Sequence, residues 1–148
     1  MKLLGPSLGV LFATAFLVAP MRSEAAAVRL GLGADYWIDE SPAFSFLLGV
    51  EGKLAGPISV GARFGASLLT DGNDVAIPLD LSIRANIANS RVYVEGLVGP
   101  WIVIDRGDTL RAHAAFGFGL QGKAASIGLE VGYLESRAII GLRLAYKF

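Results

Sequence analysis

The last nine residues, Ile140-Gly-Leu-Arg-Leu-Ala-Tyr-Lys-Phe148, decide the fold. Large apolar side chains occupy every second position, and glycine, arginine, alanine and lysine stand between them. Because successive side chains of a β-strand point to opposite faces, this period of two predicts a strand with one apolar face and one small or charged face. The chain is therefore expected to end in a β-strand.

The same alternation recurs in seven earlier segments. The eight segments cover residues 28–38, 44–54, 58–68, 75–87, 92–104, 110–121, 127–133 and 140–148. Short pieces rich in glycine, proline, aspartate and asparagine join them, and each is short enough to connect antiparallel neighbours. The pattern predicts an all-β chain that forms an eight-stranded, antiparallel, up-and-down barrel.

Composition narrows the class of protein. The chain has 148 residues, which fits one domain, and it has no cysteine for disulfides or thiolate metal sites. Thirteen basic and thirteen acidic residues cancel, which argues against a nucleic-acid partner. Mean hydropathy is high at +0.55. After residue 20, however, no apolar run approaches the roughly 20 residues that a spanning helix needs.

The first 25 residues have the layout of a secretory signal peptide. Lys2 supplies a positive start, residues 8–19 form an apolar core, and Pro20 ends it. Small-x-small patterns permit cleavage after residue 25 and as late as residue 27. An uncleaved membrane anchor is the alternative, and the shortness of the core disfavours it. Residues 26–148 are then expected to form the barrel.

The charged side chains of the strands all fall on the face opposite the large apolar ones. They are Arg29, Asp35, Glu51, Lys53, Arg63, Asp80, Arg84, Glu95, Arg111, Glu130 and Arg143. Many glycines share that face, and an eight-stranded interior is crowded. We therefore expect the polar face to line the lumen and the apolar face to contact lipid, as in a transmembrane barrel. The side chains expected to face lipid include Phe46, Leu81, Phe116, Leu129 and Leu142.

Two hairpins bring opposite charges together when only their apolar residues are aligned. A two-residue turn at Asn89-Ser90 places Arg84 opposite Glu95, and the hairpin before it places Arg63 opposite Asp80. Opposite charges on facing positions support a register. Both pairs are predicted to be structural ion pairs that fill the lumen.

The last hairpin gives a third pair. If Glu135 lies opposite Ala138, then Glu130 lies opposite Arg143. A slip by one residue would turn these charges toward lipid, so the register is expected to be firm.

The C-terminal pattern has a known parallel. Tyr146 and a final Phe148 resemble the closing strand of the small eight-stranded outer-membrane barrels, the OmpA/OmpX-like group, in which this ending is an assembly signal. The resemblance implies a Gram-negative outer membrane, periplasmic termini, contact with outer-membrane lipid, recognition by the barrel assembly machinery and a monomer. The chain departs from that group in its tight loops at residues 39–42, 70–74, 105–109 and 135–137. That departure weakens any role in adhesion through loops.

The sequence offers few candidates for catalytic residues. The single histidine, His113, lies on the polar face, where it is predicted to fill the lumen beside Trp101. The alternative is that His113 acts as a general base in a lipid-modifying enzyme. Such a base needs a serine nucleophile within hydrogen-bond reach. No serine lies within ten residues of His113 in the sequence. We expect no catalytic residue, no metal and no cofactor.

The sequence favours a barrel with a filled lumen and a structural or membrane-organising role, because eight strands leave just enough interior for their own side chains. Three alternatives stay open: a narrow solute pore, a soluble periplasmic ligand-binding barrel with the faces inverted, and a lipid-modifying outer-membrane enzyme.

Overall fold

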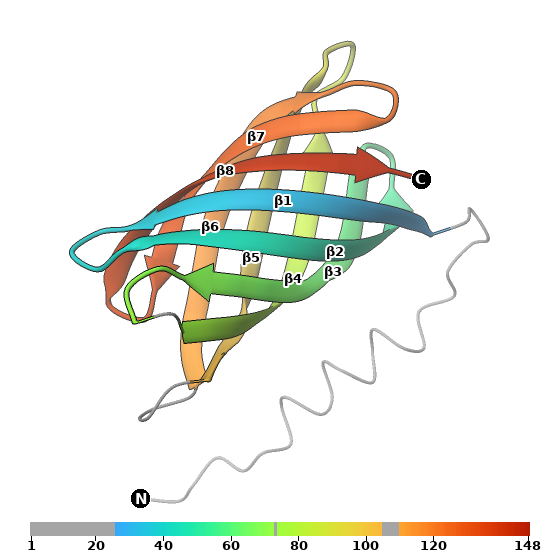
Figure 1. Cartoon of the computed structure of the whole chain (residues 1–148). Helices are drawn as coiled ribbons and strands as arrows, with labels where there is room; N and C mark the ends of the chain where they lie inside the picture. Colours follow the sequence, from blue (N-terminus) through green and yellow to red (C-terminus); the bar gives the residue numbers. More distant parts are fainter. Residues whose placement is uncertain (1–25, 73, 105–109) are drawn as a thin grey trace, which may run out of the picture.

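The computed structural model describes residues 26–72, 74–104 and 110–148, and these form a closed barrel (Figure 1). Its strands are β1 (Ala27–Trp37), β2 (Pro42–Ala55), β3 (Ile58–Leu69), β4 (Asp74–Asn86), β5 (Val92–Ile104), β6 (Leu110–Gln121), β7 (Ala125–Leu134) and β8 (Arg137–Lys147). The predicted signal peptide and the loop at 105–109 lie outside the described residues. No helix among the described residues is long and apolar enough to cross a membrane.

Each strand pairs antiparallel with the next, and β8 pairs with β1 to close the barrel. The closing pair runs from Arg29 opposite Lys147 to Trp37 opposite Ile139. Figure 1 shows β1 beside β8, with the start of β1 and the C-terminus at one end of the barrel, here called the terminal end. The opposite end is the distal end. The predicted eight-stranded up-and-down barrel is confirmed.

The apolar side chains cover the outer wall. Thirty large apolar residues are exposed, and the five expected to face lipid, Phe46, Leu81, Phe116, Leu129 and Leu142, are 42–53% exposed. Soluble proteins rarely expose apolar patches of more than a few hundred Å². The inverted arrangement, in which the apolar face forms a closed core, is therefore not the fold. The wall suits lipid contact.

Glycines on the inner face make room for charged side chains. A Cβ added to Gly33 would lie 2.6 Å from Nη1 of Arg143, and one added to Gly141 would overlap the carboxylate of Asp35. The lumen is crowded at these two positions, so the ion-paired side chains fit only because glycine faces them.

Two of the three predicted registers are correct. Arg63 lies opposite Asp80, and Arg84 lies opposite Glu95. In the last hairpin the prediction is wrong by two residues, because Glu130 lies opposite Gly141.

The cause of this shift is the position of the turn. Leu134 faces Arg137, and Glu135 is the first turn residue, with a left-handed φ of 61°. In this turn only the first central residue has a positive φ, a position where hairpin turns usually place glycine, so the sequence gives little sign of it. A shift of two residues leaves every side chain on its predicted face.

The distal end of the lumen is filled by apolar side chains that point inward. This apolar cap consists of Trp37, Ala43, Leu69, Ala76, Trp101, Val103, Leu134 and Ile139. All are at most 5% exposed. The inner face is thus polar over the middle and terminal end of the barrel and apolar at its distal end.

Candidate functional site: an ion network in the lumen

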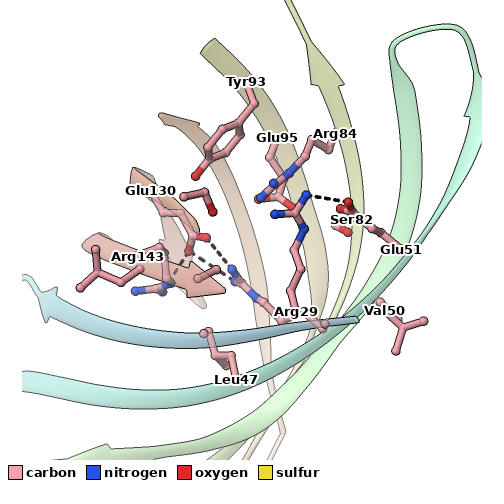
Figure 2. Close-up of a pocket in the computed structure, with 17 residues that line it drawn as sticks. Arg29, Leu47, Val50, Glu51, Ser82, Arg84, Tyr93, Glu95, Glu130 and Arg143 are labelled. Carbon is pink, nitrogen blue, oxygen red and sulfur yellow. Dashed lines mark hydrogen bonds and ion pairs between the residues drawn. The ribbon is translucent and has the colours of Figure 1, made fainter. Parts of the chain in front are cut away.

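Glu130 of β7 lies at the centre of the lumen, between two arginines. Arg63 of β3 donates from Nη1 to Oε1 of Glu130 at 2.5 Å, and Arg143 of β8 places Nη2 2.9 Å from Oε2 (Figure 2). Strands β3 and β7 are not neighbours in the barrel. The Arg63–Glu130 bond therefore crosses the lumen and joins opposite walls.

The network continues from Arg143 into β1 and β2. Nη1 of Arg143 lies 2.7 Å from Oδ1 of Asp35. The other oxygen of Asp35 accepts from the hydroxyl of Ser45 at 3.2 Å, and that hydroxyl lies 2.8 Å from the hydroxyl of Ser67. The hydroxyls of Ser45 and Ser67 thus have hydrogen-bond partners, and the carboxylate of Asp35 has an arginine beside it, which lowers the cost of burying these groups.

On the other side the network reaches His113. Nη2 of Arg63 donates to Asp80 at 3.0 Å, and Nδ1 of His113 lies 2.7 Å from the second oxygen of Asp80. Because a carboxylate can only accept, the geometry requires a proton on Nδ1. The His113 ring is 5.1 Å from the ring of Trp101, so the predicted neighbour of His113 is confirmed. Trp101 belongs to the apolar cap, which makes His113 the junction between the cap and the network.

Two more ion pairs lie toward the terminal end. Arg84 donates to Glu95 at 3.2 Å, and its guanidinium lies 4.0 Å from the centre of the Tyr93 ring. Arg29 donates to Glu51 at 2.7 Å. Figure 2 shows these side chains projecting from several strands toward one another in the lumen.

The burial of these charged side chains determines how much their ion pairs contribute to stability. The side chains of Glu130, Asp80 and Arg143 are at most 9% exposed. Removing two ions from water costs about as much as their attraction returns, so a buried pair adds little net stability. Removing only one partner leaves a buried charge unpaired, which is strongly unfavourable. We therefore predict that the network favours one arrangement of the strands.

A small cavity lies within the polar part of the lumen. Its volume is about 60 Å³, and its lining includes Arg29, Arg84, Tyr93, Glu130 and Arg143. A water molecule needs roughly 10–15 Å³ of such volume, so the cavity holds a few waters at most. None of the cap residues lines it. The cavity therefore ends before the distal end of the barrel.

All three predicted ion pairs are in contact. Arg63–Asp80 and Arg84–Glu95 meet as facing neighbours, and Glu130–Arg143 meet diagonally because of the shifted register. Their structural role stays a prediction. The bonds from Glu130 to Arg63 and from Asp35 to Arg143 were not foreseen, since hairpin alignment pairs only strands that are consecutive in the sequence, and β1 meets β8 only when the barrel closes.

The sequence did carry a signal for the apolar cap. Trp37, Leu69 and Leu134 stand at the ends of their strands, in phase with the charged positions and out of phase with the lipid-facing ones. Counting phase to the last residue of each strand would have placed them inside.

The other candidate residues have simple surroundings. Tyr146 and Phe148 pack edge to face with ring centres 5.2 Å apart, and the backbone NH of Phe148 donates to Val28 at 3.0 Å. Their role as an assembly signal stays a prediction. Within the described part of the chain, no group of three or more histidine, aspartate or glutamate side chains could hold a metal ion.

Comparison with known structures identifies the architecture. A de novo designed transmembrane barrel, TMB2.3, matches 86% of this chain over 98% of its own length, with a TM-score of 0.62 and 15% identity. The outer-membrane protein Ail of Yersinia pestis in a phospholipid nanodisc matches 83% of this chain over 99% of its own, with a TM-score of 0.54 and 15% identity.

The chain has the fold of the small outer-membrane β-barrels. The N-terminal barrel domain of Pseudomonas aeruginosa OprF is a further example, matching 82% of this chain over 97% of its own with a TM-score of 0.54 and 12% identity. No protein-family model and no curated protein matches the sequence. The predicted resemblance to small eight-stranded outer-membrane barrels is thus confirmed for the fold.

Proposed function

We propose that this protein is a structural barrel of the Gram-negative outer membrane, with both termini in the periplasm and a lumen closed to solutes. The observation that carries the proposal is the filling of the lumen. A network of buried ion pairs crosses its middle, and the apolar cap fills its distal end. An eight-stranded barrel filled in this way offers lipid a rigid wall and offers solutes no passage.

The proposed role is mechanical: the barrel occupies and organises the lipid around it. We propose no catalytic role for His113. Its bonding partner is the carboxylate of Asp80, and no serine hydroxyl within the described ranges hydrogen-bonds to it. A serine nucleophile would need such a bond to a base. The protein is proposed to act as a monomer after insertion by the barrel assembly machinery.

Deletion of the gene tests the role. A strain that lacks the protein is expected to admit an apolar dye such as N-phenylnaphthylamine faster than the parent strain, and expression of the intact chain should restore the barrier. Cell fractionation of the same strains should place the protein with outer-membrane markers. Unchanged dye uptake in the deletion strain would contradict the organising role, and recovery of the protein in the soluble fraction would contradict the location.

One observation favours a second function, a narrow solute pore. The polar cavity at the terminal end is lined by charged groups and already holds room for water. A pore would need this cavity to continue past Trp101 and Leu134, both at most 1% exposed. Conductance across planar bilayers distinguishes the two functions.

A further inference from the structure

Three cations form a rim at the terminal end of the barrel. Arg91 precedes β5, Lys123 lies in the turn between β6 and β7, and Lys147 ends β8. The backbone connects them: the NH of Gln121 donates to the carbonyl of Arg91, and the NH of Lys147 donates to the carbonyl of Ala124. The three side chains are exposed and belong to neighbouring segments.

These cations have no anionic partner in the described part of the chain. Arg91, Lys123 and Lys147 take part in none of its ion pairs. The three side chains therefore make the rim positively charged.

The distal end is built differently. Its exposed arginine, Arg137, places Nη1 2.5 Å from Glu40, and Asp39, Asp71 and Asp74 add further negative charge. The described residues thus make one end of the barrel basic and the other acidic, although the basic and acidic residues of the sequence are equal in number.

The basic rim stands directly above the lipid-facing wall. Leu120, Ile127 and Leu144 of that wall are 47–56% exposed. Leu144 and Lys147 are three residues apart on one strand, which is about 10 Å. Lys147 has the phase of Arg143 on the luminal face and is exposed, so its charged end lies at the mouth of the barrel, just beyond the end of the lipid-facing wall. The exposed rings of Tyr146 and Phe148 lie at the same end, where aromatic side chains favour the membrane interface.

We infer that the rim formed by Arg91, Lys123 and Lys147 binds the phosphate groups of anionic phospholipids in the leaflet at the terminal end. The inference rests on the membrane placement proposed above. Phospholipid is the partner because the cations lie at the mouth of the barrel, next to the end of the lipid-facing wall where headgroups gather, and have no anionic partner among the described residues. A juxtamembrane cation near anionic lipid strengthens association about fivefold.

Spin-labelled lipids test this in the intact barrel. The protein is reconstituted in phosphatidylcholine vesicles with a trace of spin-labelled phosphatidylglycerol or phosphatidylcholine, and electron paramagnetic resonance measures the immobilised fraction of each. We expect at least about fivefold preference for phosphatidylglycerol. The triple variant R91Q/K123Q/K147Q should lose the preference. The matched triple variant D39N/D71N/D74N at the distal end should keep it.

Salt supplies a second test, since 1 M salt shortens the Debye length to about 3 Å and should also abolish the preference. Equal binding of both lipids by the inserted wild-type barrel, or an unchanged preference in R91Q/K123Q/K147Q, would overturn this inference alone. Failure of the barrel to enter vesicles would instead overturn the proposed membrane placement. Circular dichroism confirms that each variant is folded.

Discussion

The two halves of the lumen are filled by opposite chemistries. At the distal end, Trp37, Trp101 and Leu134 pack as an apolar cluster that would suit the core of a soluble protein. In the middle, Arg63, Glu130 and Arg143 form a directional network of buried charges. Both arrangements close the barrel, but they respond differently to change.

The two fillings are expected to respond differently to substitutions. An apolar cluster excludes water through contacts that are not directional, and it tolerates substitutions that conserve volume. An ion network depends on direction and charge, so the loss of one member removes several charge-assisted contacts at once or leaves a buried partner unpaired. Single substitutions in the network should therefore lower stability more than those in the cap. Substitutions in the cap should instead have the larger effect on the exclusion of water and solutes.

The largest effect is expected for Glu130→Gln, which removes the charged acceptor shared by Arg63 and Arg143. Asp80 and Asp35 still pair with these arginines, but two charge-assisted contacts, each contributing about 1.5–3 kcal/mol, are lost at once. The free energy of unfolding, measured by urea titration in vesicles, should fall by about 3–5 kcal/mol. Glu135→Gln is the matched control, because its carboxylate is 52% exposed and lies 4.0 Å from Arg111. An exposed pair contributes at most about 1 kcal/mol. Equal losses for both variants would contradict the distinction.

A loss of about 2–5 kcal/mol is expected for Leu134→Ala in the cap, through lost transfer free energy and a new cavity. Leu134 is fully buried, at 0% exposure. Leu81→Ala on the outer wall removes the same atoms where lipid can fill the gap, so its loss should be smaller. The same urea titration measures both, and a larger loss for Leu81→Ala would show that the cap is poorly packed.

An intermediate effect is expected at Arg84 and Glu95. Arg84→Ala alone should lower the free energy of unfolding by about 1–3 kcal/mol, because Glu95 stays buried without its cation. Combining it with Glu95→Ala should restore part of that loss. Glu95→Ala is also measured alone. If the losses of the two single variants simply add up in the double variant, the two residues act independently and the prediction is wrong.

The smallest effect on stability is expected at the C-terminus. Phe148 is 73% exposed and its backbone NH makes one hydrogen bond to Val28, so deleting it should change the free energy of unfolding by only about 0.5 kcal/mol. The yield of the truncated protein in the outer membrane should nevertheless fall severalfold, because we predict that Phe148 is recognised as an assembly signal before the barrel folds. Phe148→Tyr, which keeps the aromatic ring, should retain the yield. Equal yields for the deleted and intact chains would refute the signal.

The sequence was most informative where one period governs a whole strand. The alternation of Leu142 with Arg143 predicts the strand and its two faces, because successive side chains of a strand point to opposite sides. The choice of the inner face came from the glycines and charges that gather on one side, since an eight-stranded interior is crowded. Hairpin registers were predictable where a recognisable turn fixes them, as at Asn89-Ser90, and failed at Glu135, whose positive φ no local residue type announces.

The candidate site was only half predictable. Arg63 and Asp80 face each other across one hairpin and could be paired from the sequence. Arg63 and Glu130 are 67 residues apart and meet only because the barrel closes with a particular stagger. No hairpin alignment contains that information, so contacts across the lumen required coordinates.

Single-channel recording in planar bilayers tests the closed lumen most directly. The wild-type barrel is predicted to insert without stable conductance steps, because the apolar cap blocks the path beyond the polar cavity. Trp101→Gly combined with Leu134→Ala, which empties part of the cap, is predicted to produce small steps if the variant inserts as a folded barrel. Stable, reproducible steps from the wild-type barrel would contradict the closed lumen and support the narrow pore.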